Sequence, residues 1–152
     1  MGVVEDRLRA LELSVPDVAR PVASYVPAVR TGSLVYTSGQ LPLRSGELIS
    51  TGKVGDTVSP EVAAECAQQC ALNAIAAVKA EVGDLDAVRR VVKVVCFVSS
   101  APDFTGQPQV ANGASDLLGK AFGGAGVHAR SAVGVSVLPL DAPVEVEIIV
   151  EV

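Results

Sequence analysis

The feature that most constrains the fold is a long segment, beginning at Ser59, in which apolar side chains recur every four residues. Ser59 is a favourable N-cap, Pro60 lacks the N–H that a first helical turn leaves unpaired, and Glu61 faces the positive end of the helix dipole. The recurring residues are Val62, Cys66, Cys70, Ala74, Val78 and Val82. This wide stripe predicts a helix that ends near Gly83. Because its side chains are mostly small, we expect the helix to lie flat against a β-sheet.

The other segments alternate between helical and strand-like patterns, which predicts an α+β fold. Helices are expected at 3–13 and 107–122, and strands at 23–30, 34–38, 47–50, 88–99, 129–138 and 144–152. Turns are expected at 31–33 and 44–46, and a flexible glycine-rich connection at 123–126. Two main helices cannot cover both faces of such a sheet, so they should pack on one face. We expect residues 1–152 to form a single domain, with 1–16 as an N-terminal helical extension.

Composition excludes several classes of protein. With 49% hydrophobic and 19% charged residues, the chain is far from the composition of disordered proteins. Its densest apolar stretch, 91–98, is interrupted by Lys93 and is too short to span a membrane. The charged N-terminus does not resemble a secretory signal. Three cysteines, an odd number, make no disulfide framework, so we expect a cytoplasmic protein.

Charge argues against a nucleic-acid partner. The net charge is −5, and the longest basic run is the pair Arg89-Arg90. Nucleic-acid binders usually gather Lys and Arg on one face, and single-strand binders add aromatic residues for stacking. This chain has only five aromatic residues. Charge and composition therefore disfavour a nucleic-acid ligand.

The last two strands are predicted to form an antiparallel hairpin. If Leu138 stands opposite Pro143, the valines of both strands share one face, which should be the core face. The other face would carry Arg130, Ala132, Gly134, Ser136, Glu145, Glu147, Ile149 and Glu151. It is either a solvated surface or a polar cleft in which the planar fork of Arg130 binds an anion.

The cysteines and the single histidine do not predict a metal site. Cys66 and Cys70 lie four residues apart on the predicted helix and Cys96 lies on a strand, so a fourth ligand is missing and the spacing is unusual. We interpret all three as small buried hydrophobic residues. Because His128 is the only histidine, we expect neither a Ser-His-Asp triad nor a metal site with several histidines. This histidine either borders the cleft or is a loop residue without a catalytic role.

Several motifs, in order along 25–152, resemble the Rid (YjgF) family. The C-terminal motif comprises 128–133, Leu138-Pro139 and the alternating 144–147, and a Ser-Gly-Gln-x-Pro segment lies at 38–42. Tyr25 precedes that segment, and Asp103-Phe104 followed by Asn112 resembles the family's central stretch. Departures from the family pattern at Ser115, His128 and Ala132 indicate a side branch.

The resemblance implies a chorismate-mutase-like fold, a homotrimer and sites in clefts between subunits. It also implies hydrolysis of reactive 2-imino acids to 2-keto acids and ammonia, without a metal or organic cofactor. Arg130 would bind the substrate carboxylate and Glu145 would orient or activate the attacking water. The residues implied to line the cleft are Tyr25, Ser38, Gly39, Asn112 and Ala132, the last through its backbone.

Two other functions stay open at this stage: a trimer that binds a small carboxylate without turnover, and an endoribonuclease or translation inhibitor, as attributed to some relatives. The predicted hairpin also leaves a geometric question. It places Glu145 six residues from the position opposite Arg130, roughly 20 Å along the strand. Either the pairing is shifted, or the two residues reach one cleft from different subunits.

Overall fold

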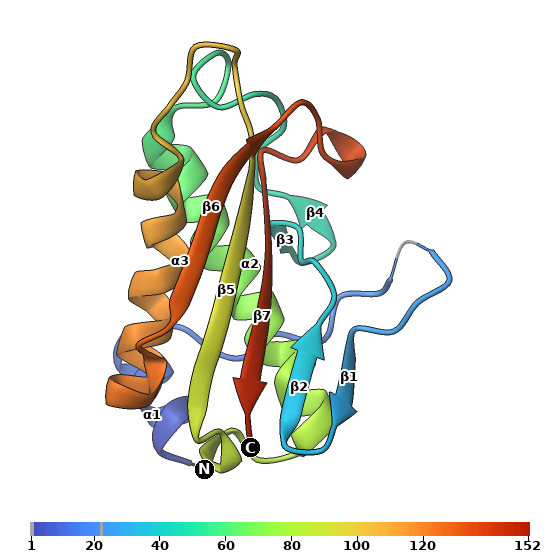
Figure 1. The fold of residues 1–152 in the computed structure, drawn as a ribbon, viewed down its shortest axis with the longest axis vertical. Coiled ribbons are helices and arrows are strands. Elements are labelled where there is room, and N and C mark those ends of the chain that lie inside the picture. Colours follow the sequence, from blue (N-terminus) through green and yellow to red (C-terminus); the bar gives the residue numbers. More distant parts are fainter. Residues whose placement is uncertain (1, 22) are drawn as a thin grey trace.

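Two long helices cover one face of a five-stranded sheet in the computed structural model, which describes residues 2–21 and 23–152 (Figure 1). The sheet strands are β1 (Ala28–Thr31), β2 (Leu34–Thr37), β5 (Arg90–Ser99), β6 (Ala129–Val135) and β7 (Val144–Glu151). Their order is β1-β2-β7-β5-β6, with β5 and β6 parallel and the other neighbours antiparallel. Strands β3 (Leu43–Arg44) and β4 (Glu47–Leu48) form a separate hairpin. The helices are α1 (Val3–Ala10), α2 (Pro60–Val82) and α3 (Gln107–Phe122). The predicted two-layer α+β fold is confirmed.

Helix α2 begins and ends as its sequence predicts. The Ser59 hydroxyl accepts a hydrogen bond from the Val62 N–H at 3.2 Å, and Gly83, at φ +83°, follows the last turn. The helix packs directly on β7, where the Cys70 thiol donates to the Val144 carbonyl at 3.7 Å. Among the described residues, no helix is both long and apolar enough to cross a bilayer.

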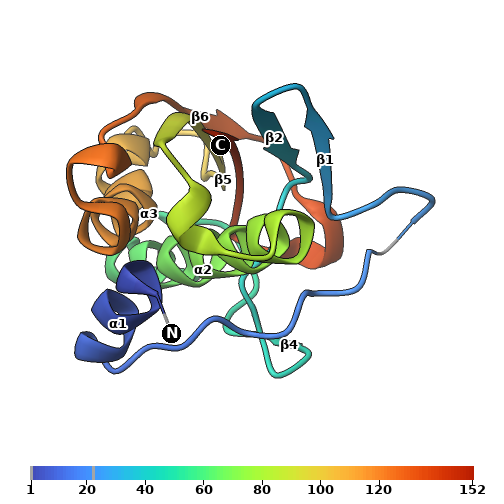
Figure 2. The ribbon, with the colours of Figure 1, turned by 90° about the horizontal axis from the view of Figure 1, so that it is seen from below.

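The opposite side of α2 is covered as well, which the pattern did not predict. Residues 69–78 are buried all round the helix. The reason is the N-terminal segment after α1, which runs along the outer side of α2 (Figure 2). Leu13 and Val15 of that segment pack against the core, and residues 12–14 and 16–20 share a groove with Gln69 and Leu72.

Helix α1 is shorter than the predicted 3–13 and depends on a distant cap. Val4 and Leu8, four residues apart, are buried in the core. The Val3 and Val4 N–H groups donate to the two carboxylate oxygens of Asp86, at 2.8 and 3.1 Å. These bonds satisfy the first turn, where Gly2 offers no side chain.

Strand β7 lies in the centre of the sheet and alternates strictly. Its core-facing residues, Val144, Val146, Ile148 and Val150, are buried, whereas Glu145, Glu147, Ile149 and Glu151 are half-buried on the other face. This division confirms the prediction for β7. The second face lies opposite α2 and α3, and we call it the open face.

The predicted hairpin between the last two strands is wrong. Strand β6 does not pair with β7; it pairs in parallel with β5, and β7 lies between β2 and β5. The reason is α3, which connects β5 to β6 as a crossover and so forms a βαβ unit with parallel strands. The chain then passes through a turn of 3-10 helix, Pro139–Asp141, to reach the other side of β5.

The face assignment of β6 is also wrong. Arg130, Ala132 and Gly134 were expected on the face away from the core, but they lie beside Val94, Cys96 and Val98 of β5, all fully buried. They therefore face the helices. The valines expected in the core point the other way, with Val133 44% and Val137 64% exposed.

The remaining boundaries differ slightly from the predictions. Strand β1 covers 28–31 rather than 23–30, and β5 starts at Arg90 rather than residue 88. The 44–46 turn is confirmed, and its two central residues, Ser45 and Gly46, have φ of +54° and +83°, as a tight hairpin requires. The glycine-rich connection at 123–126 forms a turn of 3-10 helix.

Two glycines of α3 provide a test of the packing between the helices. A Cβ on Gly113 would lie 2.0 Å from the carbonyl oxygen of Ala64 in α2, whereas a Cβ on Gly119 meets nothing within 4 Å. We expect Gly113→Ala to lower the free energy of unfolding by ~1–3 kcal/mol through overpacking. Gly119→Ala should raise it by up to ~1 kcal/mol, because alanine favours the helix. Urea unfolding measures both, and equal effects would contradict the close approach of α2 and α3.

Candidate functional site

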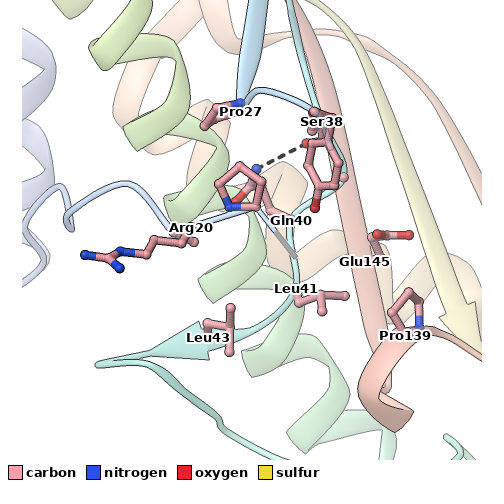
Figure 3. A pocket seen from close by; sticks show the side chains of 12 residues that line it. Arg20, Pro27, Ser38, Gln40, Leu41, Leu43, Pro139 and Glu145 are labelled. Atoms are coloured by element: carbon pink, nitrogen blue, oxygen red, sulfur yellow. Dashed lines mark hydrogen bonds between the residues drawn. The ribbon is translucent and has the colours of Figure 1, made fainter. Parts of the chain in front are cut away.

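A cavity of about 380 Å³ lies where the segment after β2 meets the beginning of β7 (Figure 3). It is lined by Ala19, Arg20, Pro21, Tyr25, Pro27, Ser38, Gly39, Gln40, Leu41, Leu43, Pro139 and Glu145. Four of the predicted site residues are therefore brought together. We call Tyr25, Ser38, Gly39 and Glu145 the cavity cluster.

The segment after β2 is held against β7 by a pair of backbone hydrogen bonds. The Gln40 N–H donates to the Val146 carbonyl at 2.8 Å, and the Val146 N–H donates back to Gln40 at 3.0 Å. The Ser38 hydroxyl donates to the Val26 carbonyl at 2.6 Å, which ties the segment carrying Tyr25 to the end of β2. The buried Gln40 amide donates to the Ser38 carbonyl at 3.3 Å (Figure 3). Ser38 thus positions other residues of the wall.

Gly39 leaves the space in which the Glu145 side chain lies. A Cβ built on Gly39 would stand 2.6 Å from a carboxylate oxygen of Glu145 and 2.7 Å from its carboxyl carbon. Any larger residue would push this side chain aside. The effect is one of space and not of backbone conformation, since the φ angle of Gly39 is not positive.

Glu145 is the titratable group inside the cavity whose pKa is shifted. Burial raises the pKa of its carboxyl above the ordinary value of 4.5, and the like charge of Glu147 raises it further. Glu147 lies two residues along β7 on the same face. A half-buried carboxyl with a raised pKa is a stronger base than an ordinary carboxyl, which suits it to accept and return a proton.

Two buried amides of α2 fix the apolar wall. The Asn73 amide donates to the carbonyls of Leu41 and Leu43, at 3.0 and 2.9 Å. Gln69 donates to the Asn73 side-chain oxygen at 3.1 Å and accepts from Arg44 at 3.3 Å. Because these buried polar groups satisfy one another, the wall is held to α2 without an unpaired amide oxygen.

Arg130 and Asn112 meet on the other side of the sheet. The Nη1 of Arg130 donates to the Asn112 side-chain oxygen at 2.8 Å and to the Ser115 hydroxyl at 3.2 Å, and Nη2 donates to the Pro108 carbonyl at 3.4 Å. All three acceptors belong to α3. Three of the five N–H bonds are thereby used. The two that remain, on Nε and Nη2, lie on the atoms that form the side-on fork for a carboxylate.

Within one chain, Arg130 and Glu145 do not share a site. Arg130 stands beside Val94 of β5 and Glu145 beside Phe97, three residues further along. Positions separated by an odd number alternate faces, so Arg130 faces the helices and Glu145 the open face. Two interstrand spacings and this offset put their Cα atoms roughly 14 Å apart. The cavity lining includes neither Arg130, Asn112 nor Ala132.

Ala132 is the remaining predicted site residue, and the cavity is also lined by residues without a predicted role. Ala132 packs its side chain against the core, which leaves only its backbone for a ligand. Gln40 and Pro139 line the cavity although no role was predicted for them; both lie inside the motifs quoted above. Arg20 also lines it, from a segment with no periodic pattern, and its guanidinium points away from Glu145 (Figure 3).

The cysteines behave as small buried hydrophobic residues, as predicted. Cys66, Cys70 and Cys96 are free and fully buried. Burial raises the pKa of the Cys66 thiol to about 11 and that of Cys96 to about 12. Within the described ranges, no three His, Cys, Asp or Glu side chains gather in a group that could hold a metal ion.

Comparison with known proteins assigns the chain to a family. A family model described as Endoribonuclease L-PSP matches residues 17–152, and the chain belongs to this family, which includes the YjgF proteins. The Agrobacterium tumefaciens protein Atu1372, of unknown function, is 45% identical over 99% of this chain and 92% of its own, with a TM-score of 0.92. The Escherichia coli YjgF gene product is 29% identical over 89% and 93%, with a TM-score of 0.64.

A relative with a named activity is similar over nearly the whole length. The 2-iminobutanoate/2-iminopropanoate deaminase of Dermatophagoides farinae is 35% identical over 91% of this chain and 93% of its own. The family therefore includes imine deaminases as well as proteins described as endoribonucleases.

The raised pKa of Glu145 can be measured directly. In a ¹³C NMR titration we expect its carboxyl to hold its proton to a pH above 4.5. Glu147→Gln should lower the pKa of Glu145, because one of its two causes is removed. Glu151→Gln, further along the same face, should leave it unchanged. An unshifted Glu145 would show that the carboxyl is better solvated than its position in the cavity indicates.

Proposed function

We propose that the protein hydrolyses reactive 2-imino acids, or their enamine tautomers, to 2-keto acids and ammonia. The observation that carries the proposal is the convergence of Tyr25, Ser38, Gly39 and Glu145 on one cavity, with the Glu145 carboxyl half-buried and its pKa raised. The similarity to a 2-iminobutanoate/2-iminopropanoate deaminase supports the same reaction. The reaction needs no metal or organic cofactor.

The complete site requires a second copy of the chain. Arg130 and Glu145 lie on opposite faces of one sheet, so one chain cannot present both to a small substrate. Two helices leave the open face uncovered, and exposed apolar side chains such as Tyr36 and Val133 occur away from the core. We therefore place the site in the cleft between neighbours of a homotrimer. The three free thiols of each chain suit the reducing cytoplasm.

Arg130 would hold the substrate by its carboxylate. Asn112, Ser115 and Pro108 already engage Nη1 and one hydrogen of Nη2. The remaining Nε and Nη2 hydrogens can donate two parallel hydrogen bonds to a carboxylate, a geometry that fixes the plane of the 2-imino acid. With the carboxylate held, C2 faces the cavity cluster of the neighbour, and positioning of this kind accelerates the attack of water.

Glu145 would act first as the general base and then as the general acid. Water attacks C2 of the protonated imine while Glu145 takes one of its protons, which gives a carbinolamine. Glu145 returns that proton to the nitrogen, the C–N bond breaks, and the oxygen becomes the carbonyl of the 2-keto acid. The hydroxyl proton leaves with ammonia as ammonium, so the net reaction consumes one water. A raised pKa makes the carboxylate a stronger base for the first step.

Binding without turnover is the main alternative, because the same clamp could hold a 2-keto acid alone. RNA cleavage, which the family description mentions, is disfavoured by the net charge of −5 and the scattered basic residues. An assay with freshly generated 2-iminobutanoate and purified protein separates these functions. Hydrolysis no faster than in buffer, with clear binding of 2-oxobutanoate, would favour the binding protein.

Arg130→Lys tests the carboxylate clamp. Lysine keeps the positive charge but loses the fork, so we expect KM for 2-iminobutanoate to rise at least tenfold, or about 1.4 kcal/mol of binding energy. Arg90→Lys, a change on an exposed residue of β5, serves as the matched control and should have no effect. Wild-type kinetics for Arg130→Lys would remove Arg130 from the site.

Mixed oligomers test whether the site is shared. Arg130→Ala and Glu145→Gln should each be inactive alone, because every site lacks one group. Refolded together in equal amounts, they should regain about a quarter of wild-type activity, since one site in four pairs an intact Arg130 with an intact Glu145 of its neighbour. No recovery, with mixing confirmed by native mass spectrometry, would mean that both residues act from the same chain.

A further inference from the structure

A chain of hydrogen bonds runs from a backbone carbonyl through His128 and Ser115 to Arg130. The Nδ1 of His128 lies 2.6 Å from the Gly126 carbonyl oxygen, and its Nε2 lies 2.8 Å from the Ser115 hydroxyl. That hydroxyl accepts from Nη1 of Arg130 at 3.2 Å. The serine belongs to α3, and the other two side chains lie in β6 or just before it.

The hydrogen bond between Nδ1 of His128 and the Gly126 carbonyl fixes the tautomer of the imidazole. A backbone carbonyl can only accept a hydrogen bond, so Nδ1 must carry a proton. In the neutral ring Nε2 is then bare and can only accept. The Ser115 hydroxyl must therefore donate to Nε2, which directs its oxygen lone pairs away from the ring. The tautomer of His128 thus decides which way the hydroxyl points.

The second link orients the guanidinium. Because the hydroxyl proton is used on His128, the Ser115 oxygen is available as an acceptor, and Nη1 of Arg130 donates to it. The other Nη1 hydrogen goes to Asn112 at 2.8 Å. With both hydrogens of Nη1 and one of Nη2 held on α3, the planar group is fixed, and the Nε hydrogen and the second Nη2 hydrogen are left for a ligand.

We propose that Ser115 and His128 are positioning residues, which hold the fork of Arg130 in the orientation that receives a substrate carboxylate. The inference rests on the proposed function for its ligand. It assigns His128 a role that needs no contact with substrate: its bare Nε2 sets the hydroxyl of Ser115, which in turn sets Arg130. Arg130 alone touches the carboxylate.

The tautomer can be tested without any ligand. His128 is the only histidine of the chain, so its two ring nitrogens give the only imidazole signals in a long-range ¹H–¹⁵N NMR spectrum. At a pH where the ring is neutral, we expect Nδ1 to show the shift of a protonated nitrogen and Nε2 that of a bare one. The Nε2–H tautomer would overturn the inference.

Binding and kinetics test the coupling to Arg130. Ser115→Ala should weaken 2-oxobutanoate binding and raise KM for 2-iminobutanoate about three- to tenfold, the loss of one hydrogen bond to a charged group, with little change in kcat. Ser115→Thr retains the hydroxyl and should restore both values. Asp116→Asn, at the next and exposed position of α3, is the control and should match the wild type.

Substitutions of His128 test whether it acts through Ser115. His128→Leu removes the acceptor and should shift KM in the same direction, whereas His128→Gln, which can present an oxygen in place of Nε2, should restore it in part. The double variant Ser115→Ala/His128→Leu should be no worse than Ser115→Ala, because the two groups lie in series. Fully additive effects would overturn the relay.

The results also separate this inference from the proposed function. If 2-oxobutanoate binds the wild type, and Arg130→Lys abolishes binding while Ser115→Ala leaves it unchanged, the relay is wrong and the clamp is right. If the wild type binds no 2-oxobutanoate and hydrolyses no imine, the proposed function fails and the inference fails with it. Urea unfolding of each variant shows whether a loss reflects folding instead.

Discussion

The alternation of side chains along a pleated strand decides which face of the sheet carries each candidate site residue. Strand β7 uses one face to pack Val146 and Ile148 on α2, and so turns Glu145 to the other. Strand β6, placed beside β5 in parallel by α3, turns Arg130 toward the helices. No change of rotamer brings two groups on opposite faces of one sheet together. A site that needs both must therefore be assembled from two chains, and the fold imposes this before any chemistry is considered.

Features encoded locally could be predicted from the sequence. Helix α2 carries its own N-cap, apolar stripe and terminal glycine, and β7 alternates so strictly that its two faces follow from the residue types alone. The pairing of β6 is a non-local property. A hairpin with β7 satisfied the valine pattern, but the helix between β5 and β6 decides the partner through the geometry of a crossover. That wrong pairing also assigned Arg130 to the wrong face.

The short motifs predicted several residues that line the cavity, but they did not predict the hydrogen bonds that hold its wall in place. Ser38, Gly39 and Glu145 lie in segments whose residue order is distinctive, and two backbone hydrogen bonds bring those segments together. The amides of Gln69 and Asn73 are hidden within an apolar helix pattern, so their role in fixing the wall appears only in the structure. Likewise, nothing in the spacing of Ser115 and His128 indicates that their side chains meet.

The three buried thiols can serve as natural probes for the opening of the core. Cys66 and Cys70 lie beneath the sheet on α2, and Cys96 lies on strand β5, between β7 and β6. Their raised pKa values and lack of exposure suppress the thiolate that alkylating reagents require. Labelling in the native state must then await separation of the helical layer from the sheet. The labelling rate would therefore measure how often the core opens, with three natural thiols as probes and no engineered residue.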